Sequence, residues 1–527
     1  MKPYLLLIAI ITLMSNKSFA QSVEVSITKG TIAGETDRGV QVFRGIPFAA
    51  PPVGDLRWKA PQAVDHWEGV LACTEFSPIC PQASYAKSSI YYSPLSEMSE
   101  DCLYLNVWSQ DILTKEKKPV MVWIHGGALT RGSGARKHYD GVNLAKKGVV
   151  VVTINYRLGA FGFLALDELS AESPDDVSGN YGILDQIAAL KWVQENIHHF
   201  GGDSNKVTIF GESAGSWSVC ALVATPMAKG LFHRAIGQSG SAFTNPLYLK
   251  EGGENSGEKI GARFMKACGA EDLKSFRQVP ADSIVSVFFN TSAGRQFKTS
   301  VLVDGYYFPK SIQEIFSAGE QNNIPTMIGS NRDEMTAFTW PSTLPKTIEE
   351  FRKNINNLYG DMASIYFEAY PVLEPKDILR SHLDHGTDRI FGLGMRQWAQ
   401  FTNEINQSAY LYQFTRIPQI KQKDYMGAYH AAEIAYVFNN LDKISSPDIY
   451  KDADYIMADQ LSNYWVNFAK HGHPNSPELP VWLPYDPDNE YYQELDLNIL
   501  SKQHLLKKRH DTLELLLQHR KESINEK

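Results

Sequence analysis

This sequence lacks an excess of positive charge. Its 51 lysines and arginines are outnumbered by 59 aspartates and glutamates, which gives a formal net charge of −8 and an isoelectric point near 6.0. Proteins that bind nucleic acids present a basic field to the phosphate backbone, so no nucleic-acid partner is expected. A neutral or cationic small molecule remains compatible with this charge.

Cysteine is scarce, with five residues in 527. None lies in a C-x-x-C pair or in another spacing typical of zinc ligands, so no metal is expected, and no cofactor is implied. An exported protein with this number is expected to hold one or two disulfides, and the odd count requires at least one free thiol. The five are Cys73, Cys80, Cys102, Cys220 and Cys268.

Hydrophobic runs of membrane length are missing as well. The apolar run at residues 4–14 is shorter than the roughly 20 residues that a bilayer core requires. It follows Lys2 and precedes the small-x-small pattern Ser18-Phe19-Ala20, which is typical of a signal-peptide cleavage site. We therefore predict a signal peptide over residues 1–20 rather than a membrane anchor. The mature chain is expected to be secreted or periplasmic, without stable membrane insertion.

The rest of the chain, residues 21–527, shows no internal repeat and no linker composition, and we predict one domain. Short apolar runs bounded by turn residues alternate with amphipathic helical patterns, such as that over residues 182–200. This alternation predicts an α/β fold with a mostly parallel central sheet flanked by helices. The expected strands are 120–124, 149–155, 207–210, 235–238 and 325–329.

Two connections, residues 78–100 and 240–305, are longer than a minimal sheet needs, and such excursions usually cap a site. The charged tail at residues 501–527 carries leucines at helical spacing. Docking of this helix onto the body is the preferred interpretation. A helix that binds a membrane surface or a partner is the alternative.

The strongest local motif is G-E-S-A-G at residues 211–215, which follows the expected strand 207–210 and precedes a helical pattern. In this context G-x-S-x-G is typical of a nucleophile elbow, in which a sharp turn presents the serine hydroxyl at the edge of a sheet. A serine needs a base and donors for the oxyanion formed on attack. Upstream, H-G-G-A at residues 125–128 ends another strand, and we assign the oxyanion donors to the backbone N–H groups of Gly127, Ala128 and Ala214.

These motifs belong to longer stretches that resemble the type-B carboxylesterase and cholinesterase family. Residues 200–215 match its nucleophile signature, and E-D-C-L-Y-L-N-V at residues 100–107 matches its second signature. The resemblance covers residues 23 to about 485. It implies the α/β-hydrolase fold, with large insertions that form a gorge over the site.

The nucleophile, acid and base of such hydrolases follow one another in that order, so the histidine should lie beyond Ser213. Among the late histidines, only His430 lies in a G-x-x-H-x-x-E-I-x-x-V-F segment that resembles the family. Two adjacent carboxylates, Asp333 and Glu334, follow the strand 325–329, and physical reasoning alone does not choose between them. The family pattern places the acid at Glu334. The late candidates for the base are His382, His385, His430, His471 and His473.

The resemblance also implies supporting roles. Glu212 and Ser239 correspond to positions near the triad, and Tyr92 stands where cholinesterases carry a tryptophan that faces the quaternary ammonium of the substrate. A tyrosine attracts cations less strongly than tryptophan, so choline esters are not favoured. The family cysteine pattern implies a disulfide between Cys80 and Cys102.

We therefore expect an exported serine carboxylesterase that acts on a small-molecule ester through an acyl-enzyme. One alternative is a catalytically silent adhesion or binding module, since this fold also hosts such proteins. The other is a lactone, carbamate or lipid hydrolase that uses the same apparatus. The sequence leaves the oligomeric state open.

Overall fold

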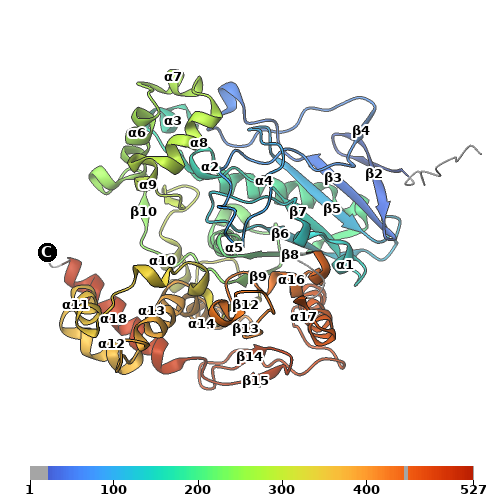
Figure 1. Cartoon of the computed structure of the whole chain (residues 1–527). Helices are drawn as coiled ribbons and strands as arrows, with labels where there is room; N and C mark the ends of the chain where they lie inside the picture. The colour runs from blue at the N-terminus through green and yellow to red at the C-terminus, as the bar shows by residue number, and fades with distance from the viewer. Residues whose placement is uncertain (1–21, 444–448, 526–527) are drawn as a thin grey trace, which may run out of the picture.

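The computed structural model describes residues 22–443 and 449–525. The predicted signal peptide lies outside the described residues. Within them, a 13-stranded sheet crosses the molecule, with helices on both faces (Figure 1). Its strands follow the order β1-β2-β3-β5-β7-β6-β8-β9-β12-β13-β14-β15, and β4 pairs with β2.

The central strands run parallel to one another, from β7 across to β14. All five strands predicted from apolar runs are confirmed here, because strands covered on both faces need apolar side chains throughout. They are β6 (Lys118–Ile124), β7 (Val150–Ile154), β8 (Gly202–Glu212), β9 (Arg234–Gln238) and β12 (Thr326–Asn331). The sheet continues through β13 (Ala409–Phe414) and β14 (Tyr492–Leu495) to the antiparallel β15 (Leu500–Lys502).

The amino-terminal edge of the sheet is antiparallel and was not predicted. There β2 and β3 form a hairpin whose two-residue turn, Arg38-Gly39, has φ angles of 51° and 81°. Such a turn matches the twist of the paired strands. The antiparallel strands are β1 (Val23–Ile27), β2 (Gly30–Asp37), β3 (Val40–Pro47) and β5 (Tyr104–Ser109), and the short β4 spans Val70–Ala72.

Each face of the sheet has its own hydrophobic core. Along β6, Val122 and Ile124 join the core under α4 (Tyr181–Asn196) and α5 (Ala214–Ala224). Trp123, between them, joins the opposite core under α17 (Asp452–His471). The helix predicted at residues 182–200 is confirmed as α4 and the 3-10 turn that follows it.

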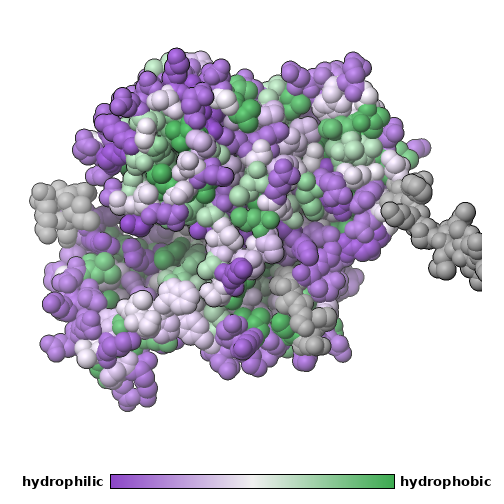
Figure 2. All heavy atoms as spheres, turned by 45° about the horizontal axis from the view of Figure 1, so that its top comes forward, coloured by the Kyte–Doolittle hydropathy of each residue, from purple (hydrophilic) through white to green (hydrophobic). Residues whose placement is uncertain are grey.

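Two long insertions build on this frame (Figure 1), and the space-filling view shows a hollow in the surface of the molecule (Figure 2). One lies between β9 and β12 and contains α6 (Gly257–Ala267), α7 (Leu273–Arg277), α8 (Ala281–Asn290), α9 (Ser292–Gln296) and α10 (Ile312–Ser317). The other lies between β12 and β13 and contains α11 (Ile348–Tyr359), α12 (Ala363–Ala369), α13 (Asp377–Thr387) and α14 (Leu393–Glu404). Of the two insertions, the sequence indicated only the one between β9 and β12.

The carboxy-terminal helix, α18 (Lys507–Asn525), packs against the second insertion. Leu513 and Leu516 are fully buried there, and Arg509 forms an ion pair with Asp388 at 2.6 Å. Docking onto the body, the preferred interpretation, is confirmed. Across residues 22–443 and 449–525, no helix combines the length and the apolar character needed to cross a bilayer.

Candidate active site

Ser213 occupies the turn between β8 and α5. Its backbone has φ 56° and ψ −122°, a region that side chains with a Cβ rarely adopt. The turn is tight because glycine lies on each side. A Cβ on Gly215 would come within 2.0 Å of the Ile124 carbonyl oxygen, and one on Gly211 within 2.6 Å of the same atom. The sequence thus folds locally into the predicted elbow, with α5 beginning at Ala214.

The turn after β6 lies beside this elbow. Gly127 and Ala128 have φ angles of 111° and 56°, and the Gly127 carbonyl accepts hydrogen bonds from the N–H groups of Thr130 and Arg131. Within the described ranges, the amides of Gly127 and Ala128 donate no hydrogen bond. The amide of Ala214 is at the first position of α5, where a helix offers no internal acceptor. Ala128 thus adopts the left-handed backbone of this turn although it is not glycine.

His430 lies between two carboxylates. Its Nδ1 atom is 2.6 Å from Glu334 Oε2, and its Nε2 atom is 3.0 Å from Glu212 Oε1. The Glu334 carboxylate also accepts a hydrogen bond from the Asn331 amide at 2.7 Å, which holds it in place. The neighbouring Asp333 is turned away, toward Arg380 at 3.0 Å.

The hydroxyl of Ser213 forms no hydrogen bond with His430 in the part of the chain that the structure describes. Ser213 and Glu212 are adjacent in the chain and both border Gly126, since a Cβ there would lie 3.0 Å from Glu212 Oε2 and 3.1 Å from Ser213 Cβ. The structure therefore brings Glu334, His430 and Glu212 into direct contact and places Ser213 next to Glu212. A hydrogen bond between a nucleophilic serine and its general base often tightens only when substrate binds.

Burial and charge oppose each other at His430. Burial alone lowers the pKa of the imidazole, but Glu212 and Glu334 outweigh it and raise the pKa to about 9. Burial raises the pKa of the Glu212 carboxyl to about 8, since the opposing effect of His430 is smaller. The charge of each group therefore depends on that of the other, and the two titrate as a coupled pair.

Next to His430 and Glu334 lies a buried hydrogen-bond network. Glu433 accepts hydrogen bonds from Gln238 at 2.9 Å and from Asn331 at 2.6 Å, and burial raises its pKa. Ser239 is buried with φ 55°, and its amide donates to the Gly329 carbonyl at 2.8 Å. Ser239 is therefore held by its backbone. The sequence reasoning missed Glu433, although it belongs to the family-like segment around His430.

The loop before β5 reaches the site through Tyr91 rather than Tyr92. The Tyr91 hydroxyl donates to the His430 carbonyl at 2.9 Å, whereas Tyr92 is 37% exposed. The Phe338 ring lies 6.4 Å from the Tyr91 ring and 5.0 Å from that of His430. Sequence reasoning missed both Tyr91 and Phe338, because an aromatic residue in a long connection gives no signal of its direction.

The sulfur atoms of Cys80 and Cys102 lie 2.6 Å apart and both side chains are buried. They are present as free thiols, so the disulfide itself is not observed. Their juxtaposition brings the loop that carries Tyr91 back to the start of the segment leading into β5.

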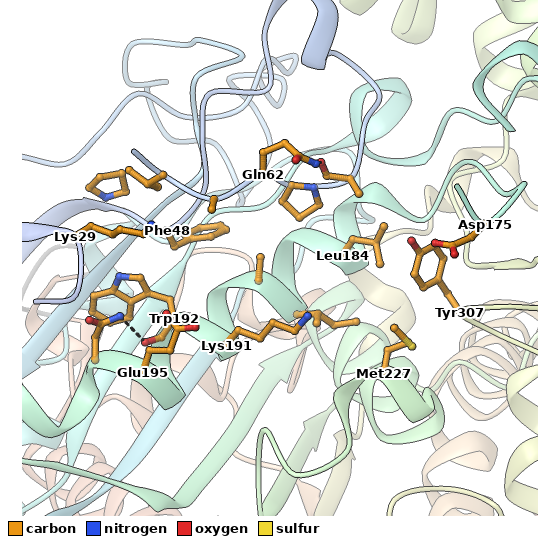
Figure 3. A pocket seen from close by; sticks show the side chains of 18 of the residues that line it. Lys29, Phe48, Gln62, Asp175, Leu184, Lys191, Trp192, Glu195, Met227 and Tyr307 are labelled. Carbon is orange, nitrogen blue, oxygen red and sulfur yellow. Dashed lines mark hydrogen bonds between the residues drawn. The ribbon is translucent and has the colours of Figure 1, made fainter. Parts of the chain in front are cut away.

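Two cavities differ in their relation to this site. One of about 470 Å³ borders it through Met335 and Phe338, and its lining combines apolar side chains with polar ones such as His382 and Arg389. The other, of about 400 Å³, is lined by none of the residues of this candidate site (Figure 3). It lies between α4, which contributes Leu184 and Lys191, and the segment before β4.

Comparison with known proteins agrees with this geometry. Residues 21–513 match the model of the Carboxylesterase family. The chain is 37% identical over 487 residues to the fumonisin B1 esterase of Sphingopyxis macrogoltabida, covering 89% of this chain and 87% of that protein. It is 37% identical over 492 residues to the para-nitrobenzyl esterase of Bacillus subtilis, covering 90% and 95%.

A solved carboxylesterase structure from Geobacillus stearothermophilus superposes with a TM-score of 0.80 at 32% identity, covering 93% of this chain and 99% of that one. A solved para-nitrobenzyl esterase structure superposes with a TM-score of 0.79 at 34% identity, with the same coverage. The predicted α/β-hydrolase fold is thereby confirmed. The chain belongs to the carboxylesterase family.

Proposed function

We propose that this chain is an exported serine carboxylesterase, with Ser213 as nucleophile, His430 as general base and acid, and Glu334 as the group that orients His430. The observation that carries the proposal is the 2.6 Å contact between His430 Nδ1 and Glu334 Oε2, next to an elbow serine with φ 56°. A proton on Nδ1 that is donated to Glu334 leaves Nε2 free to accept the proton of the serine.

In the first half of the reaction, Ser213 Oγ attacks the ester carbonyl carbon as its proton moves to His430 Nε2. The carbonyl oxygen becomes an oxyanion, which the amides of Gly127, Ala128 and Ala214 are placed to stabilise. The ester C–O bond then breaks, the proton passes from Nε2 to the departing alcohol, and the acyl group stays on Ser213.

In the second half, a water molecule takes the place of the alcohol. His430 accepts a proton from this water as it attacks the acyl carbon, and returns it to Ser213 Oγ when the acid leaves. Glu334 stabilises the imidazolium in both halves without accepting its proton. Glu212 is assigned the role of holding the imidazole from the Nε2 side until the substrate arrives.

The cavity of about 470 Å³ beside His430 supports an ester with a sizeable apolar part. Its volume is within the range that pockets for small molecules occupy, about 300–1,000 Å³. Phe338 lines this cavity, and its ring centre lies 5.0 Å from that of the imidazole. We assign the cavity to the apolar group of the substrate.

We also propose that the chain acts outside the cytoplasm, after removal of residues 1–20. The facing thiols of Cys80 and Cys102 support this assignment, because an oxidising compartment would join them and close the loop that carries Tyr91. The apolar run at residues 4–14 is the sequence feature behind it.

The proposal is tested by covalent labelling with a fluorophosphonate probe, which reacts with activated serines. The wild-type chain is expected to be labelled, and Ser213→Ala should lose both the label and ester hydrolysis, by about 10⁴- to 10⁶-fold in kcat. The matched control is Ser283→Ala on the exposed side of α8, which should be labelled as the wild type is. Absence of labelling in the wild type would instead support the catalytically silent binding module.

A further inference from the structure

Two arginines beside the oxyanion turn form no ion pair among the residues that the structure describes. Arg131 follows Ala128 by three residues, and its Nε atom donates to the Ala83 carbonyl at 3.1 Å. Arg136 directly precedes the 3-10 turn Lys137–Tyr139. Both are half-buried, and neither forms an ion pair among the residues that the structure describes.

The two guanidinium groups converge on one ring. Arg131 lies 5.0 Å and Arg136 5.9 Å from the centre of Tyr85. On its other side, Arg131 lies 4.2 Å from the ring of Phe289, which belongs to α8. Aromatic faces hold a guanidinium in position without neutralising its charge. Both guanidinium groups therefore lie against the Tyr85 ring and outside any ion pair of the described residues, and Arg136 is near enough to Glu212 to lower the pKa of that carboxyl.

Other buried arginines in this chain are compensated. Arg157 pairs with Asp185 at 2.7 Å, and Arg396 pairs with Glu490 at 2.7 Å. Burial lowers the pKa of Arg131, which is the effect of removing a cation from water without supplying an anion. An unpaired cation in such surroundings is unfavourable unless a ligand completes it.

This pair of arginines belongs to the same wall as the reacting groups. The Tyr85 ring lies 5.8 Å from that of Tyr91, whose hydroxyl donates to the His430 carbonyl. The backbone of Arg131 is also part of the oxyanion turn, since its amide donates to the Gly127 carbonyl at 3.0 Å. The two arginines are thus linked, through Tyr85 and Tyr91 and through the oxyanion turn, to the residues assigned to the reaction.

We propose that Arg131 and Arg136 bind a carboxylate of the substrate, so that this enzyme prefers esters that retain a free carboxylate group. The inference rests on ester hydrolysis at Ser213 and names the substrate class for that site. Planar guanidinium groups match a carboxylate with paired hydrogen bonds, which gives direction as well as charge. The same two charges repel a quaternary ammonium, which agrees with the expectation that choline esters are disfavoured.

The free carboxylate can belong to the acid or to the alcohol of the ester, and two matched pairs of substrates separate these cases. Monoethyl adipate is compared with ethyl hexanoate for the acid side. The acetate ester of 4-hydroxybenzoate is compared with that of 4-hydroxybenzamide for the alcohol side. The wild type should prefer the carboxylate-bearing member of one pair by about tenfold or more in kcat/KM, and that pair identifies the side.

Arg136→Gln and Arg131→Gln should each reduce this preference by about tenfold, the effect of losing a hydrogen bond to a charged group. Arg136→Gln is the safer variant, since Arg131 is also held by the Ala83 carbonyl and by Phe289. The matched control is Arg352→Gln on α11, an exposed arginine 4.7 Å from the ring of Phe367, which should leave the preference unchanged.

Equal kcat/KM values within both pairs, or a preference that survives both arginine substitutions, would overturn this inference. If the neutral esters are hydrolysed and Ser213 is labelled by fluorophosphonate, the proposed function stands even when the carboxylate preference is absent. If no ester is hydrolysed and no label forms, the proposed function fails, and the substrate class fails with it.

Discussion

His430 is flanked by carboxylates on both of its ring nitrogens, Glu334 at 2.6 Å and Glu212 at 3.0 Å. Two negative neighbours favour the imidazolium, which is why the pKa of His430 rises to about 9 despite burial. A general base must be neutral to accept a proton. We therefore expect kcat/KM to rise with pH as His430 loses its proton. The apparent pKa of this rise should lie above the value of about 6.5 that is usual for histidine.

The Glu212→Gln variant tests this electrostatic arrangement. Replacing the carboxyl by an amide removes one negative neighbour of Nε2, so the pKa of His430 should fall and the ascending limb of the pH profile should move to lower pH by about 1–3 units. The measurement is kcat/KM for a neutral ester between pH 5 and 10. The exposed Glu349→Gln on α11 is the control and should leave the limb in place. A limb that does not move for Glu212→Gln would mean that the Glu212 carboxyl is already uncharged over this range.

At the scale of elements, the contact of α5 with the end of β6 determines where Ser213 is held. A Cβ on Gly215 would come within 2.0 Å of the Ile124 carbonyl oxygen. Backbone cannot give way as a side chain does, so any larger residue must push the helix off the strand. Gly257 on α6 offers a contrast, because its nearest neighbour is the Leu302 side chain at 2.7 Å.

We expect Gly215→Ala to lower the free energy of unfolding by more than about 3 kcal/mol, and to abolish fluorophosphonate labelling because the elbow is displaced. Gly257→Ala should cost about 1–2 kcal/mol and keep the label. Urea denaturation, followed by intrinsic fluorescence, and probe labelling of both variants provide the comparison. Equal stability of the two variants would show that the helix and strand can separate freely.

At the scale of the whole molecule, the two ends of the fold are tied to the sheet differently. The amino-terminal strands extend the sheet itself, whereas α18 packs onto the second insertion through buried side chains and ion pairs. Arg396 on α14 joins Glu490 at 2.7 Å and Asp511 of α18 at 2.6 Å, which links three separate segments. The last helix therefore completes the body rather than projecting from it.

Leu516→Ala is expected to destabilise the protein by about 2–5 kcal/mol, since Leu516 is fully buried against α11 and α12. Its neighbour Leu515 is 50% exposed, and Leu515→Ala should change stability by less than about 0.5 kcal/mol. Thermal unfolding of both variants distinguishes these outcomes. If Leu516→Ala has no larger effect than Leu515→Ala, α18 is not part of the cooperative unit.

Sequence alone determined the features that depend on neighbouring residues. Apolar runs predicted the central strands, and the two glycines around Ser213 predicted the elbow, because both patterns express local backbone and burial requirements. The motif at residues 125–128 likewise indicated the tight turn that lies beside the elbow. These predictions needed no knowledge of distant contacts.

Tertiary structure decided what depends on direction and on partners far along the chain. Asp333 and Glu334 are adjacent, yet one turns to Arg380 and the other to His430. The strand pattern cannot distinguish them, because both lie beyond the end of β12, where a 3-10 turn begins and the alternation of a strand no longer applies. Likewise, Arg131 and Arg136 look like ordinary surface cations in the sequence. Only the folded chain shows that they share one aromatic ring and form no ion pair among the described residues, because the partners of a charge depend on its whole surroundings and not on the residue alone.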